Sequence, residues 1–362
     1  MENNHIHINH WLRPLSWLYG LGVGVRNWLF DADILKQKAF DCPVVNVGNL
    51  TVGGTGKTPH IELLIRMLKA DYRVAVLSRG YKRKSSGYLL ADVNTPMQAI
   101  GDEPWQMKKK FPDVIVAVDA NRQRGIAHLL DDEPQLGVNL VLLDDAYQHR
   151  YVRPRVNILL TDYHRLISED RLLPAGRLRE PIHAKNRADI VIVTKCPHDI
   201  RPINYRVIQS SLNLKPFQHL FFSTFRYGTP YRLFNETSGA EEQLTSDTHI
   251  LLLTGIASPQ QMMFDLHRIT RHITPLFFPD HHEFSRRDIN QLEQSFADLH
   301  GSKRLIITTE KDAARLLLVQ NLSPIVRRHL YVLPIEVEIL RDQQEVFRQT
   351  LQKLIHTSEA TK

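Results

Sequence analysis

The sequence contains few cysteines that could cross-link a small fold or bind structural zinc. Only two cysteines occur in 362 residues, Cys42 and Cys196, and they lie far apart in no metal-ligand spacing. Disulfide scaffolds and structural zinc sites both need several cysteines at short intervals. We therefore expect neither, and a reducing compartment is the simpler assumption.

Long hydrophobic runs are also missing. The most apolar N-terminal stretch covers 11–30, but Arg13 and Arg26 bracket only 12 uncharged residues, which include Pro14. A membrane span needs about 20 apolar residues, and no small-residue cleavage site follows. We therefore expect no transmembrane span and no secretory signal. Wound as a helix, 11–30 has an apolar stripe opposite Ser16 and Asn27, which fits either a helix in a membrane surface or one packed on the protein's own core.

Low-complexity tracts, internal repeats and nucleic-acid-binding motifs are absent as well. The composition is globular, with 43% hydrophobic and 23% charged residues and a formal net charge of +7. A basic balance alone suits nucleic acid, an anionic membrane or a phosphorylated substrate. Because no aromatic residues interleave regularly with the cations, we expect no nucleic-acid partner, and no obligate protein partner is evident.

One stretch has the features of a phosphate-binding loop. An apolar strand at 44–47 leads into a glycine-rich turn, and Lys57 and Thr58 then precede a predicted helix over 61–68. Glycines let successive N–H groups point at phosphate oxygens, and the helix N-terminus adds positive potential. Lys57 can reach the β- and γ-phosphates, and the Thr58 hydroxyl can ligate Mg²⁺. The expected nucleotide-binding residues are Thr51, Val52, Gly53, Gly54, Thr55, Gly56, Lys57 and Thr58, of which Thr51 replaces the glycine of the general pattern.

Further strands and helices alternate along the chain, which predicts an α/β fold. Strands are expected at 73–78, 114–118, 139–143, 156–161, 190–194 and 219–225, and a second α/β series at 249–254, 273–278, 304–309 and 329–333. The strand at 139–143 ends in Asp144 and Asp145. Two adjacent carboxylates at such a strand end favour a bound Mg²⁺.

Other loops carry ionisable groups whose role the residues alone leave open. Asp102 opens a predicted helix and is either a cap or a functional acid. The loop at 278–284 contains Asp280, His281 and His282. Ligands packed this tightly on one loop rarely converge on a metal, and a histidine used in proton transfer is the better interpretation. Lys195 follows a strand without the acid of a guanine-reading loop, which disfavours GTP.

Seven blocks together resemble the tetraacyldisaccharide 4′-kinase family. They lie at 47–59, 78–81, 101–104, 143–149, 178–181, 278–282 and 309–313 and occur in the family's order. The resemblance covers almost the whole chain, and Thr51 in place of the first P-loop glycine is typical of this family. It implies phosphorylation of the 4′-hydroxyl of a tetraacyl glucosamine disaccharide 1-phosphate, giving lipid IVA in lipid A biosynthesis, with ATP and Mg²⁺.

The resemblance also implies an architecture and a location. It implies a P-loop NTPase-like α/β/α core, a smaller α/β/α domain, a short β linker between them and an active site in the cleft between the domains. The corresponding divisions are an N-terminal membrane-associating helix at 1–35, the kinase core at 36–215, the linker at 216–248 and the C-terminal domain at 249–362. The implied location is peripheral, on the cytoplasmic face of the inner membrane, with the acylated lipid and the anionic membrane surface as partners.

Site residues follow from the matching motifs. The implied catalytic residues are Lys57, Asp102 as the base for the sugar hydroxyl, and His281 as its partner, with His282 as the alternative. The metal-associated residues are Thr58, Asp144, Asp145 and Glu180. The competing interpretation is a regulatory or chaperone-like P-loop NTPase, which would not need Asp102 or His281.

Overall fold

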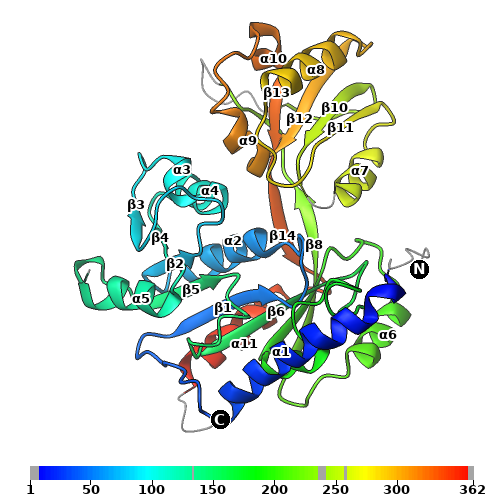
Figure 1. Ribbon diagram of the computed structural model, residues 1–362. Coiled ribbons are helices and arrows are strands. Elements are labelled where there is room, and N and C mark those ends of the chain that lie inside the picture. The colour runs from blue at the N-terminus through cyan, green and yellow to red at the C-terminus, as the bar shows by residue number, and fades with distance from the viewer. Residues whose placement is uncertain (1–7, 133, 235–241, 257–258, 358–362) are drawn as a thin grey trace. The chain divides into compact units, whose positions relative to one another are not determined.

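The structure is a computed structural model that describes residues 8–132, 134–234, 242–256 and 259–357. The chain divides into two compact units (Figure 1). Unit 1 comprises Met1–Phe225 and Val337–Lys362, and unit 2 comprises Arg226–Glu336. The boundaries fall near the end of one strand and within another, so the chain leaves unit 1 once and returns to it once.

Unit 1 is built on a nine-stranded sheet in the order β14-β8-β7-β6-β1-β5-β2-β4-β3. From β4 to β8 neighbouring strands are parallel, and β3 joins antiparallel. The central strands are buried on both faces, as a covered parallel sheet requires. The strands are β1 (Val44–Asn49), β2 (Val74–Ser78), β3 (Leu89–Ala91), β4 (Ile115–Val118), β5 (Leu140–Asp144), β6 (Val156–Asp162), β7 (Ile190–Thr194), β8 (His219–Tyr227) and β14 (Ile335–Ile339).

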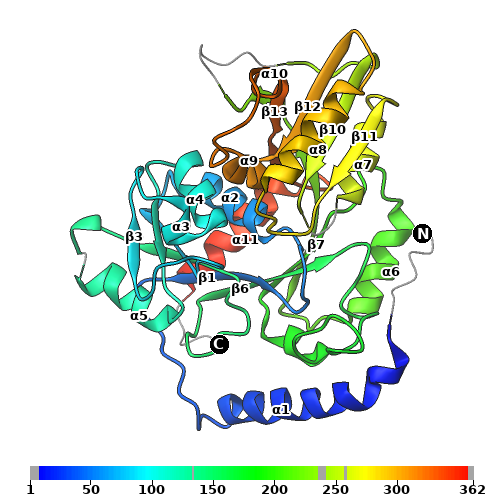
Figure 2. The same cartoon turned by 45° about the horizontal axis from the view of Figure 1, so that its top comes forward.

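Helices cover both faces of this sheet, and the alternation of strand side chains explains why. Val45 and Val47 of β1 point into one core with α2 and α11, whereas Val44 points into a core on the other face. Figures 1 and 2 show α1 on the face opposite α2 and α11. The helices are α1 (Arg13–Asp31), α2 (Lys57–Leu68), α3 (Met97–Ile100), α4 (Asp102–Lys110), α5 (Arg122–Ala127), α6 (Pro202–Leu212) and α11 (Gln344–His356), with short turns at His10–Leu12, His128–Asp132, Pro134–Leu136 and Ile182–Arg187.

Unit 2 contains a five-stranded sheet in the order β11-β10-β12-β13-β9. Four strands are parallel and β9 is antiparallel to β13. Its elements are β9 (Tyr231–Arg232), β10 (Thr248–Thr254), α7 (Gln260–His267), β11 (Ile273–Phe277), α8 (Arg286–Ala297), β12 (Lys303–Thr309), α9 (Glu310–Leu316), α10 (Pro324–His329) and β13 (Leu330–Leu333). This is the second α/β series that the sequence predicts.

The C-terminal segment differs from the expected division of the chain. Residues 249–362 were expected together, but 337–362 belong to unit 1, where β14 joins the nine-stranded sheet and α11 packs on it. The Phe347 ring lies 5.1 Å from the ring of Phe221 on β8. The expected linker also differs, because 226–248 clusters with unit 2. Its residues 235–241 lie outside the described chain.

Helix α1 turns its polar side chains toward the protein. Ser16 and Asn27 are buried, and the Ser16 hydroxyl donates to the Leu172 carbonyl. Tyr19 donates to the Arg179 carbonyl, and Asn27 donates to a Glu180 carboxylate oxygen. These contacts anchor the helix through hydrogen bonds, and most of its large apolar side chains lie on the outside, with Phe30 buried.

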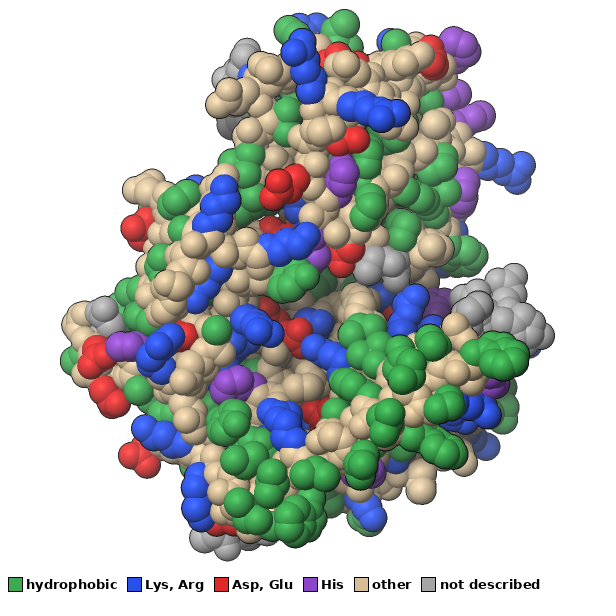
Figure 3. All heavy atoms as spheres, viewed as in Figure 1, with side chains coloured by type: hydrophobic (Ala, Val, Ile, Leu, Met, Phe, Trp, Pro, Cys, Tyr) green, Lys and Arg blue, Asp and Glu red, His purple; other side chains and the backbone are tan. Residues whose placement is uncertain are grey.

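The outer side of α1 is correspondingly hydrophobic. Its exposed large apolar residues are Leu15, Trp17, Leu18, Leu21, Val25 and Trp28, preceded by Trp11. Figure 3 shows hydrophobic side chains gathered where α1 runs in Figure 1. No helix in the described part of the chain is both long and apolar enough to span a bilayer.

Candidate active site

The turn after β1 has the backbone conformation that a phosphate-binding loop requires. Gly53 and Gly56 have φ of 112° and 85°, a region that favours glycine. A Cβ on Gly56 would also lie 2.8 Å from the Phe225 ring. Thr51 forms a β-bridge with Leu178, so this position is extended and needs no glycine. That pairing explains why Thr51 replaces the glycine of the general pattern.

Lys57 begins α2 and faces an acid at the end of the neighbouring strand. Its Nζ lies 3.7 Å from Asp145 Oδ2, and the Arg179 guanidinium donates to Asp145 Oδ1 at 3.0 Å. Burial alone would raise the pKa of Asp145, but Lys57 and Arg179 hold it below its ordinary value. The structure therefore brings together Lys57, Asp145 and Arg179 at the carboxyl ends of β1 and β5. Thr58 follows at the second position of α2.

Asp144 is buried beside this cluster. It accepts a hydrogen bond from the Ser78 hydroxyl at 3.2 Å, and its other carboxylate oxygen is buried with no partner within the described chain. Burial, together with the charges of Glu103 and Asp145, raises the pKa of Asp144 to about 7 against the lowering effect of Lys57 and Arg122. A buried oxygen without a partner next to a second carboxylate is an arrangement that a cation stabilises.

Asp102 is the first residue of α4, directly after Gly101, whose φ is 91°. Its side chain is nearly buried, and its Oδ1 accepts from the Glu103 N–H at 3.0 Å. Glu103 lies close enough to Asp144 to raise the pKa of that carboxyl. The N-terminus of α4 therefore lies near the carboxylates at the end of β5, although the two segments are far apart in the sequence.

Glu180 is hydrogen-bonded to α1. Its carboxylate is buried, pairs with Arg187 at 2.8 Å and accepts from Asn27 of α1 at 3.1 Å. Within the described chain, no three His, Cys, Asp or Glu side chains form a group able to hold a metal ion. Asp144, Asp145 and Glu180 are not such a group in the described part of the chain, and their association with a metal ion stays a prediction.

Two further groups lie near Asp144, buried Arg122 and half-buried Glu103, and the sequence does not identify either as a site residue. Arg122 donates to the carbonyls of Asp119 and Asp144, and burial lowers its pKa to about 10. Glu103 adds its charge at Asp144. Glu103 stands in a quoted motif, but nothing in the sequence places either residue beside Asp144, since both contacts depend on the packing of α4 and α5.

In unit 2, the two candidate histidines have different surroundings. His282 pairs with Asp288 at 2.9 Å and stacks on Phe278, with 4.7 Å between ring centroids. His281 has a φ of 58°, and its ring nitrogens face Lys311 and Arg315. His282 therefore anchors its loop to α8, whereas His281 contacts α9.

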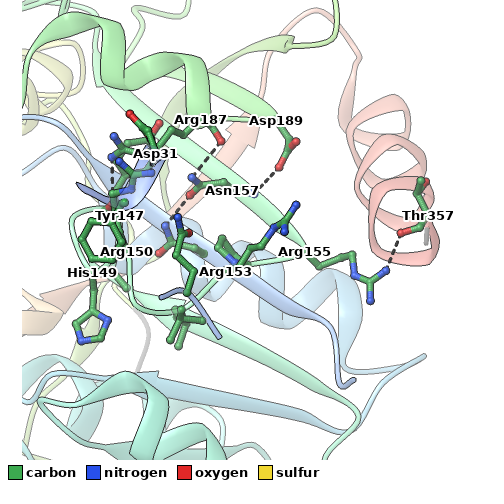
Figure 4. A pocket seen from close by; sticks show the side chains of 17 residues that line it. Asp31, Tyr147, His149, Arg150, Arg153, Arg155, Asn157, Arg187, Asp189 and Thr357 are labelled. Carbon is green, nitrogen blue, oxygen red and sulfur yellow. Dashed lines mark hydrogen bonds and ion pairs between the residues drawn. The ribbon is translucent and has the colours of Figure 1, made fainter. Parts of the chain in front are cut away.

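A cavity of about 410 Å³ lies in unit 1 under the segment that follows β5 (Figure 4). Its lining includes Asn46, Tyr147, Arg150, Arg187 and Asp189. None of the residues expected to bind the nucleotide, the metal or the reacting hydroxyl lines it. The phosphate-binding turn and this cavity are separate features of the unit.

Comparisons with known proteins show which family the chain is similar to. The family described as "Tetraacyldisaccharide-1-P 4'-kinase" (LpxK) matches residues 8–356. The tetraacyldisaccharide 4′-kinase of Phocaeicola vulgatus is 53% identical over 352 residues, covering 97% of this chain and 96% of the relative. That of Porphyromonas gingivalis strain W83 is 48% identical over 344 residues, covering 94% and 95%. The crystal structure of LpxK from Aquifex aeolicus in complex with ATP superposes with a TM-score of 0.71 at 28% identity, covering 95% of this chain and 98% of that one.

Proposed function

Because the chain belongs to the tetraacyldisaccharide 4′-kinase family, we propose which of its residues transfer the terminal phosphoryl group of ATP to a lipid sugar. The protein is an ATP-dependent kinase of lipid A biosynthesis, and its substrate is an acylated disaccharide 1-phosphate. The observation that carries the assignment of roles is the glycine-rich turn that presents Lys57 opposite Asp145.

The nucleotide phosphates are assigned to the turn from Thr51 to Thr58. Its backbone N–H groups and the N-terminus of α2 supply the positive potential that phosphate oxygens need. Lys57 then neutralises the charge that develops on the transferred phosphoryl group. Lys57 pairs with Asp145, which Arg179 also contacts, and this pairing fixes where the ammonium lies.

The acceptor hydroxyl is assigned to Asp102. The Asp102 carboxylate takes the proton of the 4′-hydroxyl while that oxygen bonds to the γ-phosphorus and the bond to the β-phosphate oxygen breaks, releasing ADP. Its place near Asp144, through the neighbouring Glu103, supports this role. His281 is proposed as the partner of Asp102, as the family motif implies, and His282, which pairs with Asp288, is the alternative.

The residues at the end of β5 fit a Mg²⁺ ion. Asp144 has a buried carboxylate oxygen that no described residue contacts by a hydrogen bond, Asp145 is adjacent, and Thr58 follows Lys57 in the chain. Bound there, Mg²⁺ would neutralise charge on the β- and γ-phosphates. Glu180, which also ties its loop to α1, is proposed as a further acid near the metal or the substrate.

We further propose that α1 lies in the surface of an anionic membrane, which brings the kinase to its lipid substrate. The support is the orientation of the helix, with hydrogen-bonded polar residues inside and tryptophans and leucines outside. Such a face matches interfacial helices, in which apolar residues enter the headgroup boundary. The cytoplasmic face of the inner membrane, where ATP is available, is the proposed location.

The decisive experiment measures transfer of labelled phosphate from ATP to an acylated disaccharide 1-phosphate, beside the same sugar without acyl chains. We expect labelled lipid only with the acylated acceptor and with Mg²⁺ present. ATP hydrolysis that is independent of the acceptor, with no labelled lipid, would instead support a regulatory P-loop NTPase.

A further inference from the structure

The ring of His281 lies between two cationic side chains of α9. Arg315 Nη2 is 3.4 Å from His281 Nδ1, and Lys311 Nζ is 3.1 Å from Nε2. Lys311 has a second partner, Asp280 Oδ1, at 3.2 Å. Both ring nitrogens therefore face hydrogen-bond donors, a situation that the sequence spacing of 30 and 34 residues does not reveal.

Arg315 is itself rigidly held. Its Nη1 donates to Asp312 Oδ1 at 3.0 Å, and Asp312 is fully buried. The other carboxylate oxygen of Asp312 accepts from the Gly255 N–H at 3.0 Å and from the Thr309 hydroxyl at 2.7 Å. Asp312 thus joins the ends of β10 and β12 and fixes the guanidinium that contacts His281.

The backbone at His281 explains why such a support matters. Its φ of 58° lies in the left-handed region, which non-glycine residues adopt only when their surroundings hold them there. The His281 N–H donates to Asp280 Oδ1 at 3.0 Å, and His282 is held by Asp288. These contacts fix the loop, and the α9 side chains fix the ring.

Counting donors and acceptors identifies the dominant contact. Arginine has five N–H donors, no acceptor, and remains charged in proteins. A hydrogen bond between Arg315 and His281 therefore requires Nδ1 to be the acceptor, which leaves the proton of a neutral ring on Nε2. Lys311 also has donors only, so a hydrogen bond from it to Nε2 would require the opposite tautomer, and one neutral ring cannot accept both bonds. Lys311 has Asp280 as an alternative acceptor and a flexible side chain, whereas Arg315 is held by Asp312.

We propose that Arg315, held by Asp312, is a positioning residue that sets the orientation and tautomer of His281. This inference rests on the proposed role of His281 in the kinase reaction. Arg315 directs Nδ1 toward α9 and keeps the N–H on Nε2. The same contact removes Nδ1 as a proton acceptor.

The test is a double-mutant cycle on the full-length kinase, with kcat and KM measured for ATP and for the acylated disaccharide 1-phosphate. We expect Arg315→Met to lower kcat at least tenfold while KM for ATP changes less than twofold. In a His281→Ala background, Arg315→Met should lower kcat less than twofold further. An equal loss in both backgrounds would show a structural role only and overturn the proposal.

Three further variants make the result specific. Arg315→Lys keeps a cation beside Asp312 with a shorter reach, and we expect an unchanged melting temperature with kcat reduced at least threefold. Arg271→Met, an exposed arginine of the same unit, should leave kcat unchanged. If Arg315→Met does not fold, Asp312→Asn with Arg315→Met removes the buried charge as well, and the same cycle is run on that pair.

Two outcomes separate the inference from the assignment beneath it. If His281→Ala has wild-type kcat, the proposed role of His281 fails, and the positioning proposal fails with it. If His281→Ala is impaired but Arg315→Met is not, only the positioning proposal fails. A Lys311→Met variant that loses more kcat than Arg315→Met would assign the tautomer to Lys311 instead and also overturn it.

Discussion

Asp102 is the residue whose replacement separates a catalytic base from a helix cap. Its Oδ1 accepts a hydrogen bond from the Glu103 N–H, and asparagine keeps that acceptor. We expect Asp102→Asn to leave ATP affinity nearly unchanged and to lower kcat by about 10²–10⁴, the usual contribution of a positioned base. Single-turnover transfer from labelled ATP measures this. Asp113→Asn, an exposed acid paired with Lys69, serves as control, and a loss below threefold at Asp102 would make it a cap only.

Residues within one continuous motif are predictable from sequence, and residues joined by packing are not. The turn from Thr51 to Thr58 is read from the spacing of its glycines and Lys57, because its geometry is local. The approach of Glu103 to Asp144 depends on how α4 packs against the sheet, and the contact of Arg315 with His281 depends on α9. The contact of Glu180 with Asn27 also depends on packing, since the two residues are 153 positions apart in the chain.

His60 is a buried residue of α2 that makes the stability of unit 1 depend on pH. Its Nδ1 donates to the Gly56 carbonyl at 2.7 Å, and its Nε2 accepts from the Ser223 hydroxyl at 3.0 Å. Burial lowers the pKa of His60 to about 4. Between pH 4 and about 6.5 the unfolded chain therefore binds more protons than the folded chain, and stability falls as the pH falls.

We expect this group to destabilise unit 1 by about 2 kcal/mol at pH 5 relative to pH 8. His60→Gln, which has no titrating group, should lose that much less stability over the same interval. The four tryptophans, Trp11, Trp17, Trp28 and Trp105, all lie in unit 1, so tryptophan fluorescence in urea reports on this unit alone. Identical pH dependence in wild type and variant would contradict the assignment.

At the scale of elements, α1 shows what a hydrophobic pattern leaves open. The sequence predicts an amphipathic helix but cannot say whether the apolar stripe faces the core or the outside. The structure answers through its hydrogen bonds, because Ser16, Tyr19 and Asn27 all bond to segments of unit 1. The strands were easier to predict, since central parallel strands are continuous apolar runs between turn residues.

Outer-face substitutions test the proposed membrane contact without disturbing the fold. Trp17 and Leu21 are 79% and 67% exposed, so Trp17→Gln with Leu21→Gln should leave the urea midpoint unchanged. Each side chain that enters a bilayer surface contributes part of its burial free energy of about 1.5–3 kcal/mol. We expect at least tenfold weaker sedimentation with anionic vesicles. Ile203→Gln with Val207→Gln on α6, also exposed, is the matched control, and equal loss in both double variants would refute the role of α1.

At the scale of the whole molecule, sequence order and spatial order differ at one place. The alternation of strands and helices after residue 249 continues without a break to the C-terminus, so sequence alone groups 337–362 with unit 2. In the structure β14 instead joins the edge of the nine-stranded sheet, next to β8. The two crossings of the chain occur on neighbouring strands of that sheet. Unit 2 is therefore an insertion into unit 1, and unit 1 requires both ends of the chain.

This insertion predicts that the kinase unit depends on α11, far from its P-loop in sequence. Phe347 is fully buried against Phe221, whereas its neighbour Val346 is 50% exposed. Phe347→Ala should lower the unfolding free energy of unit 1 by about 3–5 kcal/mol, and Val346→Ala should change it by less than about 0.5 kcal/mol. Tryptophan fluorescence in urea measures both.

Truncation tests the insertion directly. Since unit 2 is the continuous segment 226–336, circular dichroism of that segment alone should show a cooperative melt. The truncated chain 1–336 should show no cooperative unfolding transition for unit 1. A truncated chain 1–336 whose tryptophan transition matches that of the full chain would show that unit 1 is complete without β14 and α11, contrary to the insertion.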